Sequence, residues 1–106
     1  MWINLDLKKD LIQSIKEIGQ NYAIEQIVLF GSRARGDNKP ASDIDLAVFT
    51  LPEFDDRGHL TSDFDDIETL LKIDIVFVND HTDLKLLENI EREGVTLYER
   101  TENEIE

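Results

Sequence analysis

The sequence predicts a single α/β domain in which a sheet packs on helices. The chain has 106 residues, enough for one modest hydrophobic core. Segments with apolar residues at helical spacing alternate with short apolar runs of strand length, in the order helix, strand, short helix, strand, helix, strand, helix. Such alternation is typical of α/β domains. We expect residues 1–98 to form this domain and residues 99–106 an acidic, frayed tail.

Three segments have the periodicity of amphipathic helices. They cover residues 5–18, 59–71 and 82–93, and Gly19 and Gly94 are expected to end the first and the third. The side chains expected to face the core are Leu7, Leu11, Ile15, Ile18, Leu60, Phe64, Ile67, Leu70, Leu71, Leu84, Leu87 and Ile90.

Three apolar runs have the length and composition of strands. They cover residues 26–30, 43–50 and 73–78, and Val95–Tyr98 is expected to add a short edge strand. A short helix is expected at residues 33–35, between the first two strands. The strand order and the strand directions cannot be read from this pattern.

Two aspartates open the second strand. Because side chains repeat every two residues along a strand, Asp43 and Asp45 are expected on one face and Ile44 on the other. Adjacent carboxylates repel each other unless a cation lies between them, and magnesium prefers oxygen ligands. Two readings stay open from this pair alone, a metal site and a polar strand end.

Gly31 and Ser32 close the first strand. A glycine lets backbone N–H groups approach a ligand, and Ser32 is expected to cap the short helix. Helix starts of this kind collect phosphate oxygens. Ser32 acting only as a cap is the alternative.

Asp74 interrupts the third strand. A carboxylate in an otherwise buried strand needs a partner. Alone it reads as a structural aspartate, and beside Asp43 and Asp45 it reads as a third metal ligand. His81, in the following loop, is expected to be merely exposed.

The spacing of these elements is more specific than any one of them. Gly31-Ser32 is followed by ten residues and then by Asp43-x-Asp45, in the form GSRARG followed by SDIDLAV. This pattern resembles the DNA polymerase β-like nucleotidyltransferases, in particular their minimal nucleotidyltransferase (MNT) branch. The resemblance covers about residues 5–98. It implies a nucleotidyltransferase fold, a small mixed sheet with helices mainly on one face and the site on the other.

The resemblance also implies a reaction. A nucleoside monophosphate, AMP from ATP, would pass to an acceptor hydroxyl with the help of two Mg²⁺ ions. Family members use the positions of Asp43, Asp45 and Asp74 as metal ligands and catalytic residues. The implied nucleotide-binding residues are Gly31 and Ser32, with Arg33 and Arg35 as weaker phosphate contacts.

The acceptor is implied by the kind of protein that accompanies this branch. Minimal nucleotidyltransferases typically pair with a HEPN ribonuclease toxin, and the implied transfer is to a tyrosine of that toxin, which makes this chain the antitoxin. Two other classes stay open. One is a non-enzymatic module that covers the partner's site, and the other is a small-molecule nucleotidyltransferase completed by a partner subunit or a second copy.

Charge and composition restrict the partners further. The chain has 24 acidic and 11 basic residues and a net charge of −13, which opposes direct binding to nucleic acid. Arg33, Arg35 and Lys39 against Asp37 form a local basic excess that would suit a nucleoside triphosphate, or would be a solvated loop. The absence of cysteine, of a secretion signal and of a membrane-length apolar run suits the cytoplasm.

Overall fold

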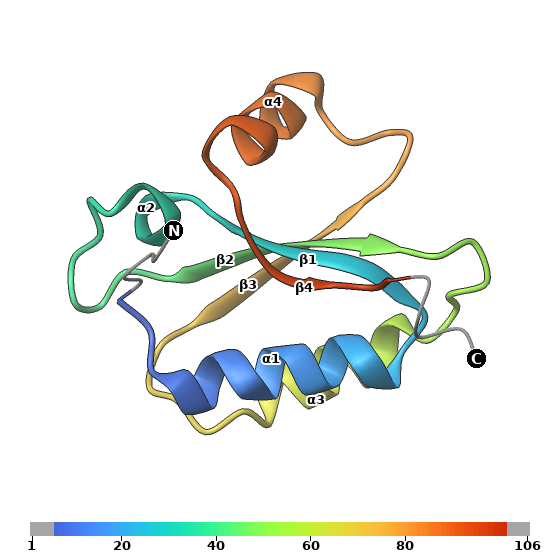
Figure 1. The fold of residues 1–106 in the computed structure, drawn as a ribbon, viewed down its shortest axis with the longest axis horizontal. Coiled ribbons are helices and arrows are strands. Elements are labelled where there is room, and N and C mark those ends of the chain that lie inside the picture. Colours follow the sequence, from blue (N-terminus) through green and yellow to red (C-terminus); the bar gives the residue numbers. More distant parts are fainter. Residues whose placement is uncertain (1–5, 102–106) are drawn as a thin grey trace.

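The computed structural model describes residues 6–101 and forms one sheet with helices on both of its faces (Figure 1). The elements of this part of the chain are α1 (Lys9–Asn21), β1 (Ile24–Phe30), α2 (Ser32–Arg35), β2 (Ile44–Thr50), α3 (Arg57–Asp65), β3 (Ile73–Val78), α4 (Leu84–Glu93) and β4 (Val95–Glu99).

The sheet is mixed, with the strand order β3-β2-β1-β4. β1 pairs antiparallel with β2 and with β4, whereas β2 and β3 run parallel. A parallel pair needs a crossover, and α3 supplies it between β2 and β3. The mixed sheet implied by the family resemblance is therefore confirmed.

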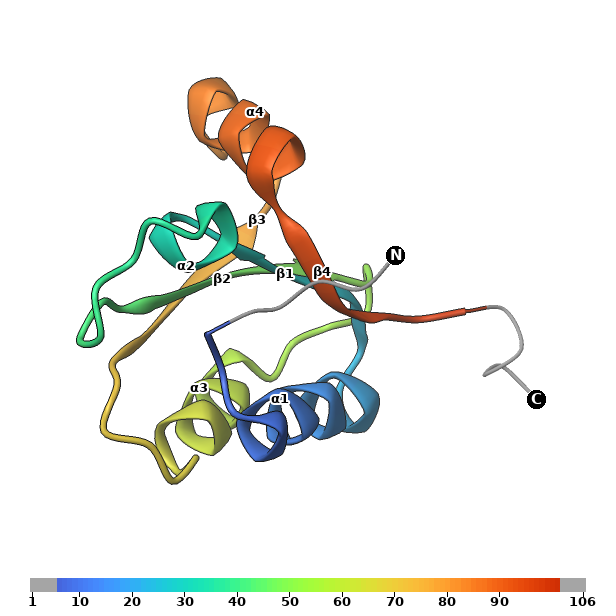
Figure 2. The same ribbon diagram turned by 60° about the vertical axis from the view of Figure 1, so that its left-hand side comes forward.

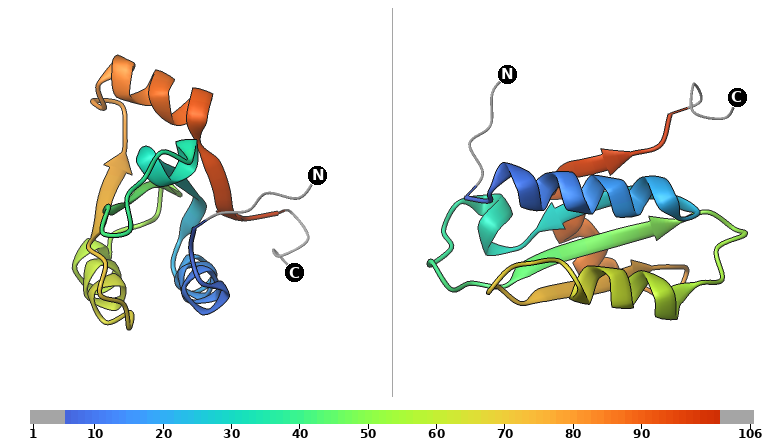
Figure 3. Two further views of the ribbon diagram at one scale, coloured as in Figure 1. Left: turned by 90° about the vertical axis from the view of Figure 1, so that its left-hand side faces the viewer. Right: turned by 90° about the horizontal axis from the view of Figure 1, so that it is seen from below.

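The main core lies between the sheet and the pair α1 and α3, which cross the same face side by side (Figure 3). Alternate residues of β2 point into it, and Ile44, Leu46 and Val48 have no exposed surface. The other aliphatic side chains of this core with no exposed surface are Ile15, Ile24, Ile27, Leu29 and Leu60. Burial of these aliphatic groups is the main source of stability.

A smaller cluster lies on the opposite face, under α4. Ile90 packs there against Val28 and Ala47, and Figure 2 shows α4 on the opposite side of the sheet from α1 and α3. Two of the three longer helices, α1 and α3, thus pack on one face of the sheet, and α4 packs on the other. Asp45 alternates with Ile44 and Leu46, so its side chain lies on the α4 face.

The first helix lies later in the chain than predicted. α1 begins at Lys9 and continues through Gly19 to Asn21, so the prediction that Gly19 ends this helix was wrong. Gly19 packs against the ring of Tyr98, where an added Cβ would lie 2.6 Å from Cδ2. Close packing rather than helix termination accounts for this glycine.

The second helix is shorter than predicted. α3 ends at Asp65, and Ile67 and Leu71 pack on the core from the following loop. That loop must return the chain to the start of β3, which is why the helical periodicity overestimates the helix. Leu70 and Leu84, both expected to face the core, are exposed instead.

The C-terminal strand is longer than predicted. Glu99 pairs with Gln26, and Arg100 donates hydrogen bonds to the carbonyls of Ile24 and Tyr22, both at 2.8 Å. The structure therefore contradicts the start of the frayed tail at residue 99, and the rest of that tail from residue 102 lies outside the described residues. In residues 6–101, no helix has the length and apolar character needed to cross a bilayer.

Candidate active site

The site is built at the turn where β1 ends, formed by Gly31 and Ser32, which we call the Gly31 corner. Gly31 has φ +80°, a backbone conformation that favours glycine, and it precedes the single turn of α2. Ser32 is the first residue of that helix, and Gly31 occupies the N-cap position, which corrects the expectation that Ser32 is the cap. The corner therefore depends on glycine's backbone freedom.

The parallel pairing of β2 and β3 places two of the three aspartates side by side. Asp45 is the register partner of Asp74, so both side chains lie on the same face of the sheet. Asp43 directly precedes β2 and is partly buried.

The pKa of Asp45 shows that several negative charges lie close together at this site. Burial raises the pKa of its carboxyl, and the nearby charges of Asp74 and Asp43 raise it further, while Arg35 lowers it. Like charges held together in this way are the situation that a bound cation relieves.

The three carboxylates are near one another but are not arranged as a finished metal site. Across residues 6–101, no three histidine, aspartate or glutamate side chains have the geometry to hold an ion together. Lys72 lies 3.4 Å from Asp74, as an exposed ion pair. The donor set and the raised pKa of Asp45 still fit a hard divalent cation, because carboxylate oxygens are the ligands that magnesium prefers.

Gly31 also brings the corner against the carboxylates. A Cβ placed on this glycine would collide with Oδ2 of Asp45. Phe30, the preceding residue, is the register partner of Asp45. Gly31 and Asp45 are thus in direct contact, which places the Gly-Ser turn beside the aspartate pair of β2 and β3.

Arg35 and Glu93 complete the corner. One oxygen of Glu93, Oε1, accepts hydrogen bonds from the Gly31 N–H and from Arg35 Nη1, both at 3.1 Å. Arg35 Nε also donates to Asp37 at 3.1 Å, and these acidic partners raise the pKa of its guanidinium. Glu93 was not predicted, because a glutamate at the end of an amphipathic helix has no distinguishing sequence signal.

Arg33 is placed differently from the other predicted nucleotide contacts. Arg33 is 3% exposed. Its guanidinium donates hydrogen bonds to the backbone carbonyls of Asp6, Pro40 and Ser42 at 2.7, 3.0 and 3.0 Å. These contacts favour a structural role, in which Arg33 fixes the loop that precedes Asp43. Two of the three residues of the predicted basic excess therefore do not present a free positive charge. Arg35 is paired with acidic side chains, and Arg33 is buried.

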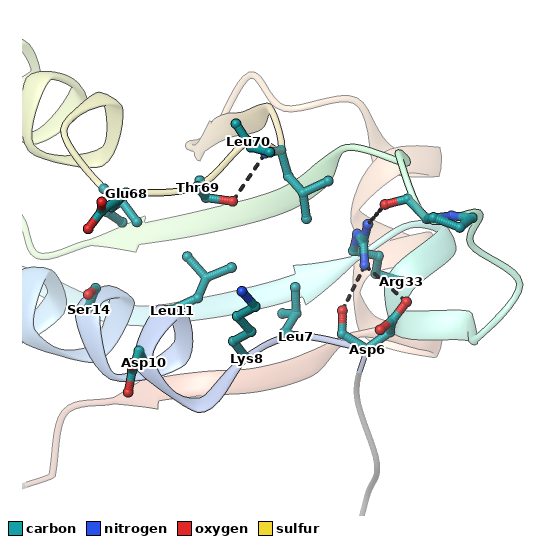
Figure 4. A pocket seen from close by; sticks show the side chains of 13 residues that line it. Asp6, Leu7, Lys8, Asp10, Leu11, Ser14, Arg33, Glu68, Thr69 and Leu70 are labelled. Atoms are coloured by element: carbon teal, nitrogen blue, oxygen red, sulfur yellow. Dashed lines mark hydrogen bonds and ion pairs between the residues drawn. The ribbon is translucent and has the colours of Figure 1, made fainter.

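A groove of about 950 Å³ opens elsewhere, between the start of α1 and the loop after α3 (Figure 4). None of the three aspartates lines it, and neither does Gly31 or Ser32. Arg33 is the residue that the groove shares with the predicted site residues. We therefore place the candidate active site at the Gly31 corner and not in this groove.

The fold and the site together define a nucleotidyltransferase-type domain. The family described as polymerase beta nucleotidyltransferase matches residues 13–103, and the chain belongs to this family.

Individual relatives agree with this assignment. A Methanocaldococcus jannaschii protein, provisionally named a protein adenylyltransferase, is 39% identical over 51 residues. The match covers 46% of this chain and 59% of that relative, so the chain spans less than two thirds of its length.

Solved structures share the fold at lower identity. A chain of a toxin–antitoxin complex with AMP-PNP matches with a TM-score of 0.63 and 22% identity, over 89% of this chain and 77% of that one. A chain from a complex of a tri-AMPylated Shewanella oneidensis HEPN toxin with an MNT antitoxin matches with a TM-score of 0.59 and 19% identity, over 93% and 78%.

Proposed function

We propose that this protein is a Mg²⁺-dependent nucleotidyltransferase that transfers AMP from ATP to a hydroxyl of a partner protein in the cytoplasm. The acceptor is a tyrosine of a HEPN ribonuclease toxin, and the transfer silences that toxin. The observation that carries the proposal is the pairing of Asp45 with Asp74 beside the Gly31 corner, in a chain that belongs to the nucleotidyltransferase family.

The reaction forms a bond between the acceptor oxygen and the α-phosphorus and breaks the bond from that phosphorus to the pyrophosphate oxygen. Asp74 helps to remove the proton of the acceptor hydroxyl, since its carboxylate lies beside Asp45 and is partly exposed. Ser32 binds the β- and γ-phosphates from the first turn of α2, and Gly31 shapes the turn that presents it.

Asp43 and Asp45 would hold both Mg²⁺ ions, and Asp74 would hold the one beside the acceptor. When bound, the ions stabilise the charge that develops on the attacking and leaving oxygens. The repulsion of Asp45 by Asp74 and Asp43, which raises the pKa of Asp45, supports this assignment.

The fold and the net charge of the chain favour a HEPN protein as the partner. Two chains with this fold come from toxin–antitoxin complexes, one of them with a HEPN toxin. The net charge of −13 suits docking on a basic, RNA-binding protein. These observations make a HEPN protein the first acceptor to test.

The experiment incubates the chain with α-labelled ATP, Mg²⁺ and a HEPN protein, and follows label on that protein by gel and by mass spectrometry of its tyrosines. We expect tyrosine adenylylation that Asp43→Asn abolishes without loss of fold. Full activity of Asp43→Asn would contradict the metal role.

Two other outcomes identify the alternatives. Toxin silencing that survives replacement of Asp43, Asp45 and Asp74 together would identify a non-enzymatic binding module. Label on a small molecule, with none on protein, would identify a small-molecule nucleotidyltransferase.

A further inference from the structure

Glu93 is the last residue of α4, and the sheet brings it to the Gly31 corner. β1 and β4 pair with Leu29 opposite Val95, so the chain that leaves α4 passes directly beside the end of β1. The Glu93 side chain is 14% exposed, whereas Glu88 and Glu91 of the same helix are exposed.

The carboxylate of Glu93 joins two parts of the corner. The same oxygen accepts the N–H of Gly31 and a guanidinium N–H of Arg35. Charge-assisted hydrogen bonds of this kind are stronger than neutral ones. Gly31, with φ +80°, adopts a backbone conformation that is one of several open to glycine, so the contact with Glu93 helps to select it.

The contact also restrains the charge of Arg35, whose Nε donates to Asp37 as well. Arg35 is near enough to Asp45 to lower the pKa of its carboxyl. Glu93 therefore holds a cation beside the aspartates at the same time as it holds the turn that precedes Ser32.

We infer that Glu93 is a positioning residue of the nucleotide-binding corner, which keeps the Gly31 turn and Arg35 in the arrangement that receives the triphosphate. This inference rests on the proposed function. In this role Glu93 retains the Gly31 N–H throughout, and Ser32 provides the phosphate contact.

The test compares Glu93→Ala and Glu93→Gln with Glu91→Ala, a matched control on the exposed side of α4. Glu93→Ala removes both hydrogen bonds, and we expect the KM for ATP to rise about tenfold with a smaller change in kcat. Glu93→Gln keeps an acceptor for Gly31, and we expect it to recover most of that loss. Glu91→Ala is expected to match the unsubstituted protein.

An NMR measurement tests the contact apart from the chemistry. The Gly31 amide proton of the protein without nucleotide should resonate downfield, keep most of that shift in Glu93→Gln and lose it in Glu93→Ala. Loss of the shift in Glu93→Ala supports the contact between Glu93 and Gly31, whether or not the protein transfers a nucleotide. Absence of nucleotide transfer would overturn the proposed function but not this contact.

Two results would overturn the inference while the proposed function stands. One is an unchanged KM in a folded Glu93→Ala that transfers AMP normally. The other is tighter ATP binding by Glu93→Ala, which would mean that Glu93 competes with the phosphates for the Gly31 N–H.

Discussion

At the scale of single residues, Asp45 holds a charge that the fold does not favour. Its pKa is raised by burial and by the charges of Asp74 and Asp43. A carboxyl whose pKa is raised on folding destabilises the protein as the pH rises through that folded value, and it has no such effect below its unfolded value. At neutral pH the site is therefore a local cost to stability, as is common where function requires charge.

We predict that Asp45→Asn raises Tm by a few degrees at pH 7 in the absence of divalent cations, and abolishes nucleotide transfer. The difference in Tm should vanish in acid, below the ordinary pKa of an aspartate. Thermal melts from acid to neutral pH measure this, and an Asp45→Asn variant that melts lower than the unsubstituted protein at pH 7 would contradict it.

The same charge predicts the response to metal. Mg²⁺ should raise the Tm of the unsubstituted protein, because only the folded chain brings the carboxylates together, and chelation by EDTA should reverse the rise. Asp45→Asn should show a much smaller response. Equal shifts in both proteins would place the bound ion elsewhere.

Arg33 shows what a residue type alone does not reveal. A basic residue after Gly31-Ser32 suggests a phosphate contact, but its acceptors are backbone carbonyls of Asp6, Pro40 and Ser42. Backbone acceptors leave no trace in the sequence, so this role could not be predicted.

We predict that Arg33→Lys destabilises the protein by about 2–3 kcal/mol, because a lysine cannot reach three carbonyls with one compact ammonium group. Urea denaturation measures the loss. The exposed Arg92 offers the control, and Arg92→Lys should change stability by less than about 0.5 kcal/mol. Similar effects of the two substitutions would show that the carbonyl contacts of Arg33 contribute little.

At the scale of elements, the sequence was more informative about strands than about helix ends. Strands β1, β2 and β3 follow from short apolar runs, and at the start of β2 the buried Ile44 and Leu46 alternate with the partly exposed Asp45, as expected. The ends of α1 and α3 were misplaced, since apolar periodicity continues into loops that also pack on the core. The order of the strands, which creates the site, depends on long-range pairing that no local pattern encodes.

Gly19 gives a stability test of one helix contact. We predict that Gly19→Ala destabilises the protein, because an added Cβ would lie 2.6 Å from the Tyr98 ring. Overpacking costs about 1–3 kcal/mol, against about 1 kcal/mol gained in helix propensity.

Gly58, within α3, is the matched control, since a Cβ there would meet nothing within 4 Å. Gly58→Ala should stabilise the protein by up to about 1 kcal/mol. Denaturant unfolding of both variants measures the difference. A more stable Gly19→Ala would show that the Tyr98 ring moves aside at no cost.

At the scale of the whole molecule, the net charge of −13 acts against the compact state. The Cα extents are 38 × 31 × 30 Å, which is about the Debye length of roughly 30 Å at 0.01 M salt. At that ionic strength most of the charges repel one another across the protein. The exposed ion pairs, such as that of Lys72 with Asp74, contribute too little to offset this.

We therefore predict that Tm rises as NaCl is increased from about 0.01 M to about 0.15 M, where the Debye length falls to about 8 Å. Choline chloride should have the same effect, because the cause is screening and not binding of a particular ion. A Tm that falls with salt would show that attractive ion pairs dominate.

The parallel register of β3 on β2 has a consequence for how reliably the chemistry is assembled. Ile73, Ile75 and Phe77 pack on the main core, and Asp74 lies between them on the opposite face. A slip of one residue would bury Asp74 in hydrocarbon and turn the apolar groups outward. The hydrophobic contacts that drive folding therefore also fix the position of this carboxylate. A folded protein with Asp74 on the wrong face would be unstable.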